Sequence, residues 1–188
     1  MGLVIGLCGS KGSGKDQFFK TVYNNFPFLD VRKIAYADPI KHEVMHIFDL
    51  INEEQYDLFK RNSLRYDLPG YLGNSVSGRS TVREIGMLMR RYDENQFTKY
   101  VEDTINAAPS SVCWCITDLR FENELDSIKN KLGGIIVKVN RAGFNYDGHI
   151  TETEFSDDIC DHVIQNSSTL EDYEIEIVSK MKSLLSPT

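Results

Sequence analysis

The residues with the clearest chemical potential stand near the start of the chain, in the segment GSKGSGK at residues 9–15. The segment fits the pattern GxxxxGK and lies between an apolar run, residues 3–8, and a stretch with apolar side chains at helical spacing. Such glycines let backbone N–H groups turn inward on phosphate oxygens, and the helix that follows adds the positive end of its dipole. We predict a phosphate-binding P-loop (Walker A motif) whose ligand-holding residues are Gly9, Lys11, Gly12, Ser13, Gly14 and Lys15.

The next residue, Asp16, departs from the usual motif, which has Ser or Thr there to place a hydroxyl on magnesium. A carboxylate so close to bound phosphates repels them unless a cation intervenes. We therefore predict that Asp16 holds Mg²⁺, directly or through water, since carboxylates suit this ion. The alternative is an acid favourably placed in the first turn of a helix, an effect of about 0.3–1 kcal/mol.

A second acid, Asp118, ends the apolar run at residues 112–117, the strongest strand pattern after the first. In an open α/β sheet the ligand crevice lies at the carboxyl ends of the strands, so Asp118 and Gly9 should meet there beside the metal. Arg120 and Glu124 follow on one helical face, and we predict that they act in catalysis with Asp118. The alternative is a helix cap at Asp118 and an exposed i,i+4 ion pair.

Arginines gather in the middle of the chain. Phosphoryl transfer between two nucleotides requires positive side chains on the acceptor and on the transferring group. We predict that acceptor phosphates are bound by Arg79, Arg83, Arg90, Arg91 and Arg120. Arg141 opens a later polar stretch, from which a lid could close on the donor. A single exposed arginine is more often a solvated surface residue, and it is the grouping that favours a site.

The apolar patterns predict the elements that position these residues. Apolar runs at residues 3–8, 34–37, 112–117, 135–139 and 162–165 alternate with helical stripes. Strands that are apolar on both faces and separated by helices indicate the α/β class, with about five parallel strands and helices on both faces. We expect one domain, residues 1–188, with a helical and loop insert at about 50–108 and a lid-like loop at about 141–158. Residues 62–80 within the insert read as an exposed loop.

Composition limits the classes of function. The chain has 188 residues and a formal net charge of −7, which disfavours a protein that binds nucleic acid through its phosphates. No apolar run approaches the roughly 20 residues needed to cross a bilayer, and no membrane partner is expected. The four cysteines, Cys8, Cys113, Cys115 and Cys160, are predicted to pack in the core as reduced thiols of a cytoplasmic protein.

With these residues in view, the chain resembles the bacteriophage-type deoxynucleoside monophosphate kinases, a branch of the P-loop nucleoside monophosphate kinases. The motifs that carry the resemblance are GKD at residues 14–16, ADPIK at 37–41, REIG at 83–86, DxRFxNE at 118–124, HITE at 149–152 and VIQN at 163–166. The resemblance spans most of the chain and implies the three-layer P-loop kinase fold.

The resemblance also implies an activity, the magnesium-dependent transfer of the γ-phosphoryl group of ATP to a deoxynucleoside 5′-monophosphate for viral DNA precursor supply. It implies that Asp38 contacts the acceptor, that Arg141 acts from a lid and that Asn166 lies near the adenine. It further implies that Glu124 orients Arg120 or the acceptor. It is compatible with a homodimer in the host cytoplasm, although no apolar stripe in the sequence indicates an interface.

Two alternatives remain open at the level of sequence. The chain could be another small-molecule P-loop kinase, for example one that acts on a dephospho-coenzyme. It could instead be an NTP-binding switch that regulates a partner protein. The arginine group favours a kinase, because a simple switch has no second anionic ligand to hold.

Overall fold

The computed structural model describes residues 2–61, 77–143 and 155–186. No helix within these ranges is both long enough and apolar enough to cross a membrane. The chain divides into two compact units, the first comprising Met1–Tyr36 and Val101–Thr188 and the second comprising Ala37–Tyr100.

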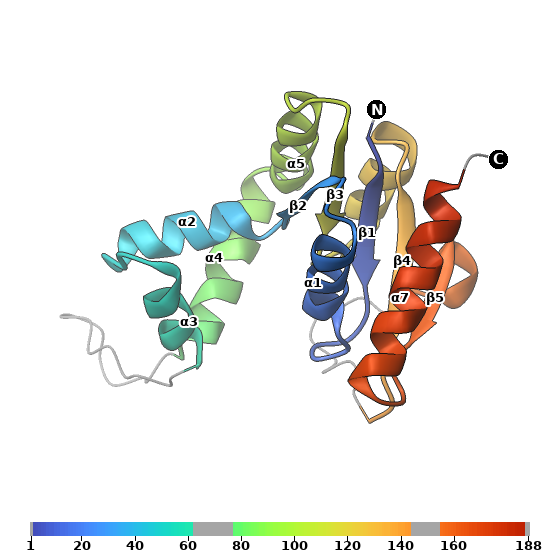
Figure 1. Ribbon diagram of the computed structural model, residues 1–188. Coiled ribbons are helices and arrows are strands. Elements are labelled where there is room, and N and C mark those ends of the chain that lie inside the picture. Colours follow the sequence, from blue (N-terminus) through green and yellow to red (C-terminus); the bar gives the residue numbers. More distant parts are fainter. Residues whose placement is uncertain (1, 62–76, 144–154, 187–188) are drawn as a thin grey trace. The chain divides into compact units, whose positions relative to one another are not determined.

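The first unit is built on a five-stranded parallel sheet with the strand order β2-β3-β1-β4-β5 (Figure 1). In chain order the strands are β1 (Val4–Cys8), β2 (Asp30–Ile34), β3 (Val112–Ile116), β4 (Ile135–Asn140) and β5 (His162–Gln165). Every residue of β1 and β3 is buried, as expected for strands covered on both faces. The strand β1 is central, so the chain that leaves its carboxyl end is flanked by the ends of β3 and β4.

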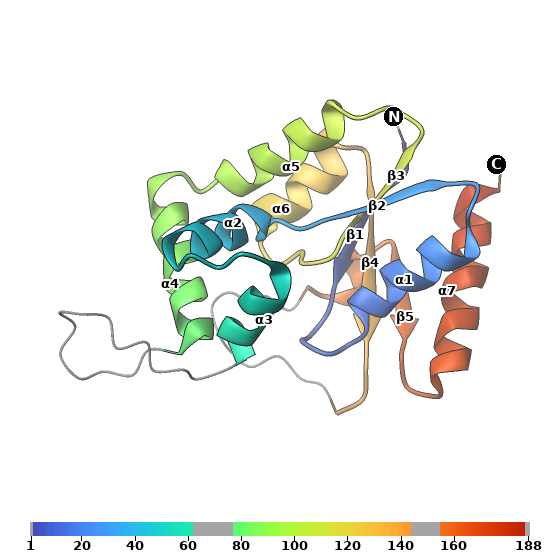
Figure 2. The same cartoon turned by 60° about the vertical axis from the view of Figure 1, so that its left-hand side comes forward.

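Helices cover both faces of this sheet, as the sequence predicts (Figures 1 and 2). One face carries α1 (Lys15–Asn25) and α7 (Leu170–Leu185). Their side chains Phe18, Val22, Tyr173, Ile177 and Met181 join the sheet residues Ile5, Leu7, Val137 and Val139 in one buried core cluster. This arrangement is the three-layer α/β architecture.

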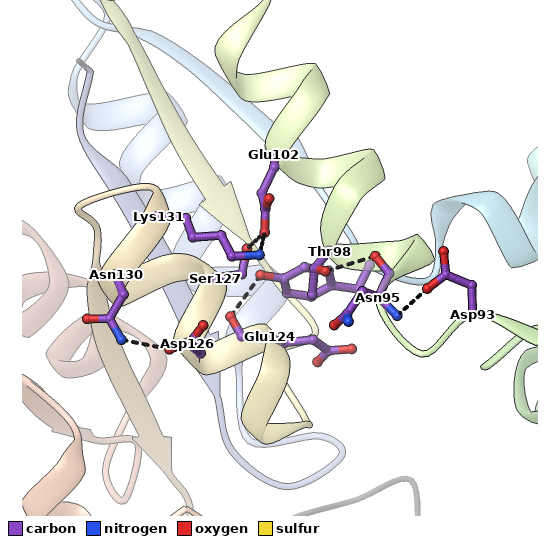
Figure 3. Close-up of polar contacts among 10 residues, drawn as sticks. Asp93, Asn95, Thr98, Glu102, Glu124, Asp126, Ser127, Asn130 and Lys131 are labelled. Atoms are coloured by element: carbon purple, nitrogen blue, oxygen red, sulfur yellow. Dashed lines mark hydrogen bonds and ion pairs between the residues drawn. The ribbon is translucent and has the colours of Figure 1, made fainter. Parts of the chain in front are cut away.

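The opposite face is covered by α6 (Glu122–Asp126), by the π-helical turn η1 (Ser127–Lys131) and by the later part of α5 (Gln96–Asn106). Glu102 of α5 accepts hydrogen bonds from Ser127 at 2.7 Å and from Lys131 at 3.0 Å, and Figure 3 shows both side chains directed at it. The buried Ile128 packs beside Gly6 of β1, where an added Cβ would lie 2.4 Å from its Cδ1 atom. Glycine at this position therefore lets the helix approach the strand closely.

The second strand lies earlier in the chain than its apolar run suggests. The apolar run covers residues 34–37, whereas β2 occupies Asp30–Ile34. Only Val31 and Ile34 are buried in this strand, because β2 stands at an edge of the sheet and its other side chains face solvent. The four cysteines are free thiols, and all except the half-buried Cys160 are fully buried, as predicted.

The second unit is helical. It contains α2 (Asp38–Ile47), α3 (Glu53–Arg61), α4 (Gly78–Tyr92) and the start of α5. The rings of Phe48 and Phe59 pack against each other at an interplanar angle of 38°, with centroids 4.8 Å apart, and join the end of α2 to α3. Of the loop predicted at residues 62–80, residues 62–76 lie outside the described ranges. The last residues open α4 instead, because the Ser77 hydroxyl accepts the Ser80 N–H at 3.1 Å and caps the helix.

Candidate active site

The loop between β1 and α1 follows the tight course that its glycines predict. Gly9, Gly12 and Gly14 have positive φ angles of 137°, 81° and 118°, a conformation that other residues rarely adopt. The Ser13 N–H donates to the Ser10 carbonyl at 3.1 Å, and α1 begins directly after the loop. Because the N-cap residue Gly14 has no side chain to accept from them, the first N–H groups of α1 are suited to bind an anion.

Two residues from the C-terminal part of the first unit hold this loop in place. The Asn166 side-chain amide donates to the Ser13 carbonyl at 2.8 Å, and the Tyr173 hydroxyl donates to the Gly14 carbonyl at 3.1 Å. Burial raises the pKa of Tyr173 above its usual range, so this hydroxyl stays a donor. A Cβ atom on Gly14 would lie 2.7 Å from the Asn166 amide nitrogen and 3.1 Å from the Tyr173 ring. The loop is therefore clamped against α7, with no space for a side chain at its last position.

Lys15 folds over the loop that precedes it. Its ammonium group donates to the Gly9 carbonyl at 2.7 Å and to the Ser10 carbonyl at 2.9 Å. The Ser13 hydroxyl oxygen is fully buried inside the loop and, among the described residues, has no hydrogen-bond partner. A buried polar atom without a partner is costly. The loop thus combines a cation and an unsatisfied hydroxyl, as expected of a cradle for phosphate oxygens, while Lys11 is exposed at its tip.

Asp16 is exposed in the first turn of α1 and forms an ion pair with Lys33 of β2. The Lys33 ammonium lies 2.5 Å from the Asp16 carboxylate, and the exposed fractions of the two side chains are 42 % and 75 %. The cation that the sequence requires beside this carboxylate is therefore present in the chain itself. Nothing in the local sequence around Asp16 indicates Lys33, because the contact depends on the position of an edge strand.

Asp118 lies at the carboxyl end of β3, as the strand pattern predicts. The next residue, Leu119, donates its backbone N–H to the Leu7 carbonyl at 3.3 Å, so Asp118 lies beside the end of β1, directly before the loop. One carboxylate oxygen of Asp118 accepts the Tyr36 backbone N–H at 2.8 Å. The half-buried carboxylate is thereby fixed at the edge of the sheet where ligands bind in open α/β folds.

Glu124 is buried, with 1 % of its surface exposed, unlike the surface residue that the four-residue spacing suggests. Its carboxylate accepts the backbone N–H groups of Arg120 at 2.8 Å and Phe121 at 3.1 Å and caps α6. Its backbone carbonyl accepts the Tyr36 hydroxyl at 3.1 Å. Burial and the carboxylates of Glu124 and Asp118 raise the pKa of this hydroxyl, so it remains protonated. Glu124 therefore orients the backbone of Arg120, and Tyr36 holds both ends of the segment 118–124.

The predicted arginines at positions 79, 83, 90 and 91 all lie on α4 of the second unit. Arg79, Arg83 and Arg90 are half-buried, and their spacing of four and seven residues puts them on one face of the helix. Arg90 lies over the ring of Phe97, with 4.6 Å from its guanidinium carbon to the ring centroid, a cation–π contact. Arg91, one position further, is exposed and belongs to another face.

Asp38 belongs to the second unit as well. It stands in the first turn of α2, where Pro39 follows it as the sequence predicts. The Asp38 carboxylate contributes to the raised pKa values of Tyr56 and Tyr100, in which burial is the larger cause. Asp38 is therefore a half-buried acid at the start of this unit, near enough to two phenol groups to influence them electrostatically.

Arg141 follows β4 and reaches the loop. Its guanidinium donates to the Gly12 carbonyl at 3.1 Å, although the two residues are 129 positions apart. Residues 144–154 of the predicted lid, which include His149 and Glu152, lie outside the described ranges. The lid segment continues at Phe155, whose carbonyl accepts the buried Lys138 ammonium at 2.6 Å.

Lys138 is a buried cation that the sequence motifs do not single out. It lies inside the apolar run of β4, and its ammonium also contacts Asp157 at 2.7 Å. A charged side chain within a buried strand requires a partner. The lysine inside this apolar run is therefore a local sign in the sequence that such a partner exists. No comparable local signal marks Lys33, Tyr36 or Tyr173, since their partners lie far away in the sequence.

The fit of a divalent cation rests on Asp16 and Asp118. Within the described ranges, no three or more His, Cys, Asp or Glu side chains are grouped so that they could hold a metal by themselves. Mg²⁺ in kinase sites, however, is usually bound by one or two carboxylates together with substrate phosphates and water. A pair of acids at the phosphate-binding edge of the sheet is compatible with that mode.

Comparison with known proteins adds to this geometry. No model of a protein family matches the sequence. A curated relative from Acanthamoeba polyphaga mimivirus, described as "Putative deoxynucleotide monophosphate kinase", is 29 % identical over 192 residues. The match covers 94 % of this chain and 95 % of the relative, so the similarity extends well beyond the P-loop.

Two solved structures with the same fold are kinases. A dephospho-CoA kinase from Campylobacter jejuni is similar with a TM-score of 0.53 at 15 % identity, over 98 % of both chains. The Mycobacterium tuberculosis APS kinase CysC, in complex with AMPPNP and APS, is similar with a TM-score of 0.52 at 10 % identity, over 96 % of this chain and 98 % of that one. At these identities the likeness establishes the fold alone. The curated relative and the shared fold together support the resemblance found in the sequence, and the chain is a phosphotransferase with the P-loop kinase fold.

Proposed function

We propose that the protein transfers the γ-phosphoryl group of ATP to deoxynucleoside 5′-monophosphates in a magnesium-dependent reaction and so supplies DNA precursors for a virus. The observation that carries this proposal is the similarity to a viral deoxynucleotide monophosphate kinase along 94 % of the chain. The geometry of the first unit supports the donor half of the reaction.

ATP is the proposed donor, and its phosphates would bind at residues 9–15. Support comes from the uncapped start of α1, from the buried Ser13 hydroxyl, which has no partner within the described ranges, and from the Lys15 ammonium above the loop. An analogue of ATP bound to a kinase of the same fold, the APS kinase, is consistent with this donor. Lys11 and Arg141 would add positive charge at the loop tip, and Asn166 would hold the loop or approach the adenine.

Asp16 and Asp118 are the proposed residues for Mg²⁺. When bound, the ion would neutralise phosphate charge that develops during transfer. Asp118 is well suited to this role because one of its oxygens is fixed by the Tyr36 N–H. Asp16 would act through an exposed carboxylate that also forms an ion pair with Lys33.

The acceptor would bind through its phosphate to Arg79, Arg83, Arg90, Arg91 and Arg120, with Asp38 as a further contact. Arg120 is supported by the rigid turn that Glu124 imposes on its backbone. The face of α4 shared by Arg79, Arg83 and Arg90 supports a grouped role for those three. Arg91 has weaker support, since it lies on another face.

The reaction requires no strong general base. An oxygen of the acceptor phosphate, already an anion, forms the new bond to the γ-phosphorus, while the bond to the β,γ-bridging oxygen breaks and ADP leaves. The protein must therefore position the two nucleotides, neutralise charge and exclude water. The loop, the acids and the arginines would position the nucleotides and neutralise their charge. A lid at about residues 141–158 would exclude water.

The same proposal includes an organisation and a location. The chain would act as one P-loop kinase domain, residues 1–188, with an acceptor-binding insert at about 50–108. A cytoplasmic protein that works on small nucleotides, as a homodimer or a monomer, is consistent with this activity.

The test is formation of nucleoside diphosphate from Mg-ATP with each of the four common deoxynucleoside monophosphates, separated by chromatography. AMP and GMP serve as ribose controls, and dephospho-coenzyme A serves as a control for the other kinase class. We expect turnover with one or more deoxynucleotides and little with the controls. Turnover confined to dephospho-coenzyme A, or to no acceptor at all, would contradict the proposed substrate class.

A further inference from the structure

The contact that the proposed reaction leaves unexplained is the ion pair between Asp16 and Lys33. Asp16 stands directly after Lys15, where a hydroxyl is usual, and places an acidic side chain beside the phosphate-binding loop. Negative charge at this place opposes the binding of a polyphosphate. A chain with an acid here needs a compensating positive charge whenever no metal ion is bound.

Lys33 is placed to supply that charge. It belongs to β2, in register with Cys115 of β3, and lies one residue before the carboxyl end of its strand. Its ammonium lies 2.5 Å from the Asp16 carboxylate, across 17 positions of sequence. The pair therefore joins the outermost strand β2 to the first turn of α1. It lies at the carboxyl ends of the strands, where the P-loop leaves β1.

Folding stability gives little reason for the pair. Both side chains are substantially exposed, and ion pairs in water contribute little to folding because solvent screens them and ordering them costs entropy. A polyphosphate that binds at the loop, in contrast, experiences the net charge of its surroundings directly. Substitution of Lys33 should consequently lower the affinity for nucleotide much more than it lowers the melting temperature.

We propose that Lys33 is a positioning residue for nucleotide binding, which neutralises Asp16 and fixes its carboxylate beside the P-loop. This inference rests on the proposed function, because it assumes that the loop binds a nucleoside triphosphate. Lys33 acts through Asp16 and not by contact with the phosphates. The charge of Lys33 should therefore matter only in a chain that has an acid at position 16.

The test is calorimetric binding of ATP in the presence of EDTA, so that no divalent cation can substitute for Lys33. The variants are Lys33→Met, Lys33→Arg, Asp16→Asn and the double variant Lys33→Met with Asp16→Asn. Lys20→Met, an exposed lysine elsewhere on α1, is the matched control for a general loss of positive charge. Melting temperatures measured in parallel exclude loss of folding.

We expect Lys33→Met to weaken ATP binding about tenfold, the size expected of one uncompensated charge near the phosphates. Because the effect is electrostatic, it should grow at low ionic strength. Lys33→Arg and Lys20→Met should bind within about threefold of the wild type. The double variant should bind as well as Asp16→Asn, since the charge that needs compensation is gone.

Unchanged binding by Lys33→Met would overturn the inference while leaving the proposed function intact. A double variant as weak as Lys33→Met would also overturn it, because Lys33 would then act on the phosphates themselves. Absence of ATP binding by the wild-type chain, with and without Mg²⁺, would instead overturn the proposed function, and the inference with it.

Discussion

The P-loop and the arginine-bearing helix α4 differ in how firmly the fold determines them. The loop is held by buried side chains from distant parts of the first unit, with the Asn166 amide and the Tyr173 hydroxyl bonded to its carbonyls. The α4 arginines stand on one helix of the second unit, and the contact described for them is with a neighbouring aromatic ring. Donor binding should thus be sensitive to packing, whereas acceptor binding should depend on charge.

The largest expected effect is at Lys15. Replacement by alanine removes the ammonium that lies over Gly9 and Ser10, so phosphoryl transfer should fall by at least about a thousandfold. The fold should remain intact, because the side chain is only half-buried. Diphosphate formation and a thermal melt followed by circular dichroism measure the two effects. Near-normal turnover in this variant would remove the basis for the P-loop assignment.

A second test probes the packing of the donor loop at Gly14. Alanine there has to adopt a φ of 118° and meet the Asn166 amide nitrogen at 2.7 Å, so it should destabilise the protein by about 2 kcal/mol and abolish tight ATP binding. Gly133→Ala is the matched control, since its φ of 55° is also positive but its Cβ meets nothing within 4 Å.

The control substitution Gly133→Ala should lower the free energy of unfolding by about 1 kcal/mol and leave ATP binding unchanged. Equal effects of the two substitutions on ATP affinity, measured by calorimetry alongside urea unfolding, would mean that the contacts of Gly14 do not shape the nucleotide site.

A third test separates the acceptor side from the donor side at Arg83. Arg83→Ala should raise the KM for the acceptor about tenfold and leave the KM for ATP and the melting temperature almost unchanged. Arg61→Ala is the control, because Arg61 is an exposed arginine of the same unit. Steady-state kinetics with each substrate varied in turn give the comparison. A change in the KM for ATP alone would place Arg83 on the donor side.

The smallest effect concerns the role of Asn166. If its amide holds the loop, Asn166→Ala should raise the KM for ATP and for GTP by a similar factor of about three to ten and destabilise the fold by about 1 kcal/mol. If it recognises adenine, the loss should be confined to ATP. Kinetics with both donors therefore distinguish the two roles.

The parts of the molecule that sequence reasoning predicts well are those whose cause is local. The glycines and the buried run of β1 determine a strand, a tight turn and a helix within a few residues, and the runs of β3 and β4 predict buried strands for the same reason. The edge strand β2 is different, because Val31 and Ile34 are its only buried residues and leave no clear pattern. Its position could be found only from the sheet as a whole.

The site divides in the same way. The place of Asp118 after a predicted strand indicates that it lies at the carboxyl ends of the strands, where ligands bind. It does not indicate that the Tyr36 N–H donates to the Asp118 carboxylate. A spacing of four residues suggests a surface ion pair for Arg120 and Glu124, whereas burial turns the carboxylate toward backbone N–H groups. The pairing of Asp16 with Lys33 depends on the register of an edge strand, which no local pattern reports.

The measurement that tests the central claim most directly is phosphorus NMR of Mg-ATP incubated with the protein, with and without a deoxynucleoside monophosphate. Transfer between two nucleotides predicts ADP and the deoxynucleoside diphosphate in equal amounts, and almost no ADP when the acceptor is left out. Slow release of ADP and inorganic phosphate at the same rate in both samples would contradict the kinase account and favour a nucleotide-hydrolysing switch.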